Sequence, residues 1–80
     1  MQKSITSKAY AVFLDCLRET REQAGITQLE LAERLDETQS FVSKCERGER
    51  RLDVAELKEF CEAMDTTLDK FIKLYLREVG

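Results

Sequence analysis

The sequence has no histidine, no proline and no tryptophan, and only three glycines among its 80 residues. Because histidine is absent, catalytic triads and dyads built on imidazole are excluded, and the sequence shows no metal-ligand cluster or phosphate-cradling glycine loop. The lack of proline and the scarcity of glycine favour helices throughout. We therefore expect an all-α protein that is not an enzyme and uses neither a metal nor a cofactor.

Cysteine is sparse and irregularly placed. The three cysteines show no CxxC spacing, so a zinc-binding set is not indicated. Cys45 and Cys61 fall on apolar positions and are expected to be buried, reduced thiols. Cys16 is expected to be exposed.

Long apolar runs are also missing. No segment approaches the roughly 20 residues that cross a membrane, and no signal-peptide pattern opens the chain. These absences predict a cytoplasmic protein without membrane contact. The length predicts one domain, 1–80, with a barely sufficient core, and residues 1–6 are expected to be a frayed end.

Residues 27–48, TQLELAERLDETQSFVSKCERG, predict two short helices joined by a tight turn. Thr27 can cap the first helix, and Glu30, three residues on, completes a capping box. Thr38 can cap the second helix, and Gly48 follows that helix where a left-handed C-cap residue belongs. A pair of this kind, with a polar start to its second helix, is typical of the helix-turn-helix that reads the major groove of DNA.

Three more helices are predicted around this motif. One extends to about Ala24 from Ser7 or Ser4, either of which can cap it. Another begins near Asp53, whose carboxylate is a suitable cap. The last covers residues 68–79 and carries a wide apolar stripe.

The full pattern resembles the lambda repressor/Cro-like (XRE) family of helix-turn-helix transcription regulators over roughly residues 10–76. The resemblance is carried by Phe13, Leu17, Arg21, Gly25, Thr27, Gln28, Leu31, Ala32, Leu35, Thr38, Gln39, Ser40, Ser43, Glu46, Gly48, Leu57, Cys61, Met64 and Leu68. It implies a five-helix lambda repressor-like DNA-binding domain, with the helix-turn-helix at its second and third helices. It also implies an ion pair between Arg21 and Glu46 that ties the first helix to the third.

The expected DNA-reading residues lie on the second motif helix, about 39–47, because the first residues of such a helix face base edges. They are Gln39, Ser40, Ser43 and Lys44. Gln39 can pair with adenine through two hydrogen bonds, and Lys44 can reach guanine or a phosphate. Phe41 either touches a thymine methyl group or packs locally.

The expected phosphate and positioning contacts are Gln28, Thr38, Arg47, Arg50 and Arg51. Gln28 resembles a family glutamine that bonds a phosphate, at a helix N-terminus whose dipole favours anions. The three arginines against Glu49 give residues 47–52 a net charge of +2, although the whole chain carries −3. Local charge matters more than the total because salt screens distant charges.

The sequence leaves the assembly open. Tyr75, Leu76 and Val79 lie on the apolar stripe of the last helix, where they either form a homodimer contact or cover the first helix. A symmetric dimer would read two half-sites of a palindromic operator in double-stranded DNA.

The leading hypothesis is a sequence-specific DNA-binding regulator, either a repressor or an antitoxin-type autoregulator. Asp36 and Glu37 depart from the family pattern, in which the turn usually holds glycine and then an apolar residue. Their charges oppose phosphate. The alternative is therefore a protein-interaction adaptor with the same fold, a protein partner and weak or no DNA binding.

Overall fold

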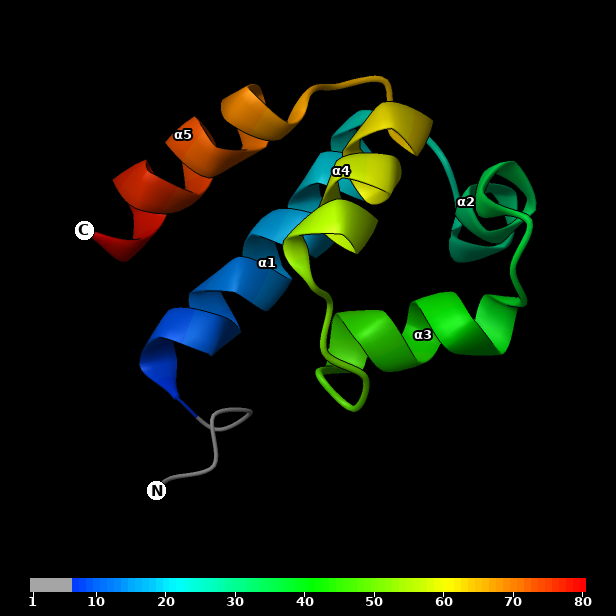
Figure 1. The fold of residues 1–80 in the computed structure, drawn as a ribbon, viewed down its shortest axis with the longest axis horizontal. Helices are drawn as coiled ribbons and strands as arrows, with labels where there is room; N and C mark the ends of the chain where they lie inside the picture. The colour runs from blue at the N-terminus through cyan, green and yellow to red at the C-terminus, as the bar shows by residue number, and fades with distance from the viewer. Residues whose placement is uncertain (1–6) are drawn as a thin grey trace.

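The computed structural model describes residues 7–80, and that part of the chain forms five helices and no strands (Figure 1). The helices are α1 (Lys8–Gln23), α2 (Gln28–Leu35), α3 (Gln39–Arg47), α4 (Val54–Ala63) and α5 (Leu68–Val79). The predicted all-α, five-helix fold with a helix-turn-helix at α2 and α3 is confirmed. The predicted frayed end at residues 1–6 and the alternative cap Ser4 lie outside the described residues.

Every helix begins after a serine, threonine or aspartate whose side chain accepts a backbone hydrogen bond from the residue three positions on. Ser7 performs this role for α1, where its Oγ accepts from the Tyr10 N–H at 3.1 Å. At α2 the capping box is complete, since the Thr27 N–H also donates to Glu30 Oε1 at 2.8 Å. Such caps satisfy N–H groups that have no partner inside the helix, and so they fix where each helix starts.

Two aspartates that follow helices adopt the left-handed backbone conformation, which is usually occupied by glycine. Asp36 follows α2 with φ 58°, and Asp65 follows α4 with φ 63°. Both positions are followed by a threonine that caps the next helix, Thr38 or Thr67. The turn between α2 and α3 is therefore formed by an aspartate at the position where the family pattern has glycine.

We predict that Asp36→Gly raises the free energy of unfolding by about 0.5–1 kcal/mol, because glycine adopts positive φ without steric cost. The midpoint of thermal unfolding should rise by a few degrees, at about 4–8 °C per kcal/mol for a domain of this size. Asp65→Gly is the matched control. It should gain less, because the Asp65 carboxylate also pairs with Arg34 at 3.3 Å. A lower midpoint for Asp36→Gly would contradict the prediction.

The helices pack in two groups that share one core. α1 and α5 lie side by side, α2 and α3 form the helix-turn-helix, and α4 contacts both α2 and α5 (Figure 1). The core consists of Cys16, Leu17, Ile26, Leu31, Ala32, Val42, Cys45, Leu57, Phe60, Cys61, Met64 and Phe71. Since α3 packs against α2 and α1 but lies at the edge of the molecule, one of its sides is left for solvent.

The prediction that Cys16 is exposed is wrong, because the side chain is buried in the core. α1 packs against α5 as well as α3. More than one side of the helix is therefore buried. Burial raises the pKa of the Cys16 thiol, and it raises those of Cys45 and Cys61 to about 11. All three therefore stay protonated near neutral pH. No helix within residues 7–80 is long and apolar enough to cross a membrane.

Candidate nucleic-acid interface

The side of α3 that faces solvent carries the four residues predicted to read bases. Val42 and Cys45 point into the core and anchor the helix. Gln39, Ser40 and Lys44 are exposed and Ser43 is half-buried. Residues four positions apart share one helix face, so the structure brings these four together on one surface, which we call the reading face.

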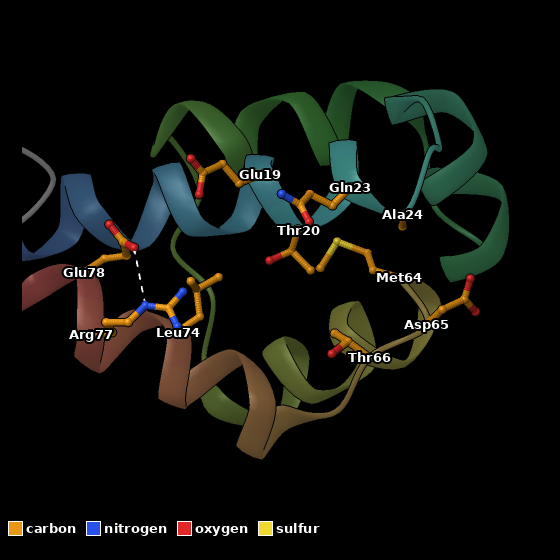
Figure 2. A pocket seen from close by; sticks show the side chains of 10 residues that line it. All are labelled: Glu19, Thr20, Gln23, Ala24, Met64, Asp65, Thr66, Leu74, Arg77 and Glu78. Atoms are coloured by element: carbon orange, nitrogen blue, oxygen red, sulfur yellow. Dashed lines mark ion pairs between the residues drawn. The ribbon is translucent and has the colours of Figure 1, made fainter.

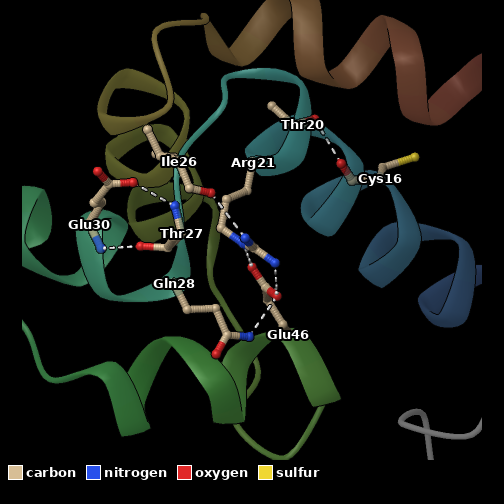
Figure 3. A network of polar contacts seen from close by, with 8 residues as sticks. All are labelled: Cys16, Thr20, Arg21, Ile26, Thr27, Gln28, Glu30 and Glu46. Atoms are coloured by element: carbon tan, nitrogen blue, oxygen red, sulfur yellow. Dashed lines mark hydrogen bonds and ion pairs between the residues drawn. The ribbon is translucent and has the colours of Figure 1, made fainter.

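A buried ion pair holds the other side of α3. Arg21 Nε donates to Glu46 Oε2 at 2.6 Å and Arg21 Nη2 donates to Glu46 Oε1 at 3.2 Å (Figure 3). The side chains are only 12% and 5% exposed. Because Arg21 donates these hydrogen bonds to the Glu46 carboxylate, the pKa of Arg21 is raised. The structure thus brings together the two residues that the resemblance paired, in the two-point geometry that favours arginine.

The same network reaches the start of α2. Gln28 Nε2 donates to Glu46 Oε1 at 2.9 Å, and Arg21 Nη1 donates to the carbonyl of Ile26 at 3.0 Å (Figure 3). One carboxylate on α3 therefore accepts hydrogen bonds from α1 and α2. Since these contacts come from three helices, they fix the end of α3 relative to the rest of the molecule.

Gln28 and Thr38, two predicted phosphate contacts, both lie at helix starts. A primary amide carries two N–H donors, so Gln28 can bond Glu46 and still offer one N–H to a phosphate. Thr38 Oγ1 accepts from the Phe41 N–H at 3.1 Å, which leaves its hydroxyl proton to donate. Their contact with phosphate stays a prediction.

The three predicted phosphate arginines are all engaged within the chain. Arg47 Nε donates to Glu49 Oε2 at 2.8 Å. Arg50 forms a two-point pair with Glu56, at 2.6 and 3.1 Å. The third, Arg51, stacks over the ring of Tyr10 at 4.1 Å from its centroid. The loop after α3 is therefore held in place by its own basic side chains.

Phe41 packs locally, which was one of its two predicted roles. Its ring lies 6.2 Å from that of Phe60, and the Arg50 guanidinium sits 5.1 Å over it. Arg50 thus lies between the Phe41 ring and the Glu56 carboxylate. These two contacts fix the position of the loop that carries it. The Arg50–Glu56 pair was not predicted, because a separation of six residues across a helix start follows no helical spacing.

The acidic turn lies beside the reading face. Asp36 and Glu37 are both exposed, and the Glu37 N–H donates to the carbonyl of Ala32 at 2.9 Å. Since Glu37 immediately precedes the cap of α3, its charge stands near the start of that helix. The turn keeps the backbone geometry of a helix-turn-helix and adds two negative charges to it.

The predicted dimer residues divide between two roles. Tyr75 covers α1, because its hydroxyl donates to the carbonyl of Ala9 at 3.3 Å and its ring meets Phe13 edge-on. Leu76 is 60% exposed, and Val79 is half-buried. Beside them, Ile72 borders an apolar groove of about 300 Å³ between α1, α4 and α5. The rest of the groove is lined by Tyr10, Phe13, Leu52, Asp53, Val54, Leu57, Phe71 and Tyr75.

A second hollow, of about 430 Å³, opens between α1 and α5 (Figure 2). Thr20 and Met64 face its centre, and Glu19, Arg77 and Glu78 lie at its edge. It contains no residue of α3 and is separate from the reading face. Within residues 7–80, no group of histidine, cysteine or acidic side chains is arranged to hold a metal ion.

Comparison with known proteins identifies the motif. A helix-turn-helix family model matches residues 17–71. Among solved structures, an XRE-family like protein from Pseudomonas syringae pv. tomato str. DC3000 is 46% identical, with a TM-score of 0.82 over 90% of this chain and 88% of that chain. The clp gene regulator ClgR from C. glutamicum is 22% identical, with a TM-score of 0.80 over 92% of this chain and 96% of that one, and shows likeness of fold. No curated protein sequence matches the chain.

Proposed function

Since this chain belongs to the XRE family of helix-turn-helix DNA-binding regulators, which are not enzymes, we propose that it binds double-stranded DNA sequence-specifically and reads the major groove with α3. The observation that carries the proposal is the reading face. Gln39, Ser40 and Lys44 are exposed on a helix whose opposite side is fixed by Val42, Cys45 and the Glu46 network. Base recognition requires a rigidly held helix whose polar side chains face outward.

We further propose a homodimer that acts as a repressor or an antitoxin-type autoregulator in the cytoplasm. A palindromic operator would place two α3 helices about 34–36 Å apart, one turn of DNA. The molecule measures 34 × 24 × 20 Å, so equivalent points in two copies placed end to end along the longest axis would lie about 34 Å apart. The apolar groove and the exposed Leu76 supply a surface for the second copy. A dimer seated on its operator would block access to the same DNA.

The test is selection of duplexes from a random DNA library with the purified protein at moderate salt, followed by sequencing. We expect a palindrome whose half-sites are separated by about 10–10.5 bp or a multiple of that. If no motif is enriched while circular dichroism shows the helices intact, the proposed function is wrong.

A protein-interaction adaptor is the second candidate, and it is supported by charge. Asp36 and Glu37 are exposed beside α3, and the arginines at the end of α3 and in the loop that follows it are engaged by Glu49, Glu56 and Tyr10. This function predicts no duplex binding even at low salt, where phosphate contacts are strongest. It also predicts a tight complex with a protein partner.

We predict that Gln39→Ala relaxes base preference at one position of each half-site. A glutamine that pairs with adenine through two hydrogen bonds contributes about 1–3 kcal/mol of discrimination. Selection with the variant should therefore return the same operator with one position degenerate. Gln23→Ala is the control, because Gln23 is an exposed glutamine on α1, away from the reading face. An unchanged preference would remove Gln39 from the base contacts.

A further inference from the structure

The last residue of α3 is already bound by a carboxylate of its own chain. Arg47 Nε donates to Glu49 Oε2 at 2.8 Å, while Arg47 Nη1 donates to Ser43 Oγ on the reading face. Both side chains of the pair are about half exposed, at 54% and 52%. The pair therefore stands in solvent at the edge of the surface on which a DNA backbone would lie.

The backbone after α3 presents Glu49 to Arg47. Gly48 turns the chain with φ 82°, and the Glu49 N–H then donates to the carbonyl of Lys44 at 2.9 Å. This turn brings residue 49 back over the end of α3. The hydrogen bond from Arg47 lowers the pKa of the Glu49 carboxyl, so the group is charged at neutral pH.

We propose that Glu49 competes with DNA phosphate for Arg47 and thereby limits the sequence-independent affinity of this interface. Phosphate contacts strengthen binding to every duplex alike, whereas base contacts distinguish one sequence from another. For Arg47 to contact a phosphate, that phosphate must replace the Glu49 carboxylate. Binding then depends more on the reading face and less on charge.

The inference rests on the proposed function and goes beyond it, because it assigns a role to an acidic residue outside the proposed DNA contacts. Glu49→Gln should tighten binding about fivefold, because a phosphate would no longer have to break an exposed ion pair to reach Arg47. The gain should be equal for the selected operator and for an unrelated duplex. The plot of log affinity against log salt should become steeper by about one, as one more phosphate contact forms.

A double-mutant cycle separates competition for Arg47 from a general loss of negative charge. The four proteins are the unchanged chain, Glu49→Gln, Arg47→Ala and the double variant, each measured on both duplexes over a series of salt concentrations. The gain from Glu49→Gln should disappear when Arg47 is alanine. Glu37→Gln is the matched control, since Glu37 is an exposed carboxylate near α3 that forms no ion pair within residues 7–80. Its smaller effect should be the same with and without Arg47.

Each outcome decides the inference. A gain that survives in the Arg47→Ala background, or one that Glu37→Gln reproduces, overturns competition at Arg47. If the unchanged chain and Glu49→Gln bind equally, the inference is wrong while the proposed function stands. Should only Glu49→Gln bind duplex at low salt, the inference is supported. If neither binds while both remain helical, both the inference and the proposed function fail.

Discussion

Arg21→Ala is expected to lower the free energy of unfolding by about 3–5 kcal/mol, the usual cost of breaking one side of a buried ion pair. In the unchanged chain the Glu46 side chain is only 5% exposed, and the variant leaves Gln28 as its remaining side-chain partner. A buried charge that loses its counter-ion retains the cost of desolvation without the attraction that offset it. Small domains are stable by only about 5–15 kcal/mol in total, so a large fraction would be lost.

Urea denaturation monitored by circular dichroism measures this effect, with Arg18→Ala as the control. Arg18 also lies on α1 and pairs with Asp15 at 3.2 Å, but its side chain is 46% exposed. Such an exposed pair contributes about 0–1 kcal/mol. If Arg21→Ala cost no more than Arg18→Ala, the ion pair with Glu46 would not hold the helices together.

Arg21→Lys separates charge from geometry. Lysine keeps the positive charge but cannot donate from a planar fork to both carboxylate oxygens and to the Ile26 carbonyl. We expect Arg21→Lys to lower the free energy of unfolding, but by less than Arg21→Ala does. Because the network joins α1, α2 and the end of α3, duplex affinity should fall together with stability in this series.

The helix starts could be predicted because cap chemistry is local. A side chain such as Thr27 or Asp53 bonds an N–H only three residues away, so a short stretch of sequence contains both partners. The left-handed C-cap Gly48 was also predictable, because glycine directly follows the last residue of α3. These features depend on neighbours in the chain and not on how the helices pack.

The side-chain partners of the candidate interface were harder to predict. The Arg21–Glu46 pair spans 25 residues and came from the family resemblance, whereas Gln28 as a further donor to Glu46 was not predicted. The burial of Cys16 depends on α5, which the sequence of α1 alone does not place. Only packing decides which of several charged or apolar neighbours a side chain meets.

Leu76→Ser is expected to convert an operator-binding dimer into a monomer and to weaken operator binding by roughly 10²–10⁴-fold. The side chain is 60% exposed on α5, beside the apolar groove where Ile72 and Val54 are also exposed. Serine there removes apolar area from the proposed contact between copies. Two linked reading helices bind with an effective concentration that a monomer lacks, which accounts for the size of the loss.

Arg77→Ser is the matched control, because Arg77 is the next residue on α5 but lines the hollow on the α1 side, where it pairs with Glu78 (Figure 2). Sedimentation should show a dimer for the control and a monomer for Leu76→Ser. Affinity for an isolated half-site should be equal in the two variants, since the reading face is unchanged. If Leu76→Ser stays dimeric, the contact between copies lies elsewhere. If it becomes monomeric yet binds the full operator undiminished, each copy reads DNA independently, and a palindrome would reflect two separate sites.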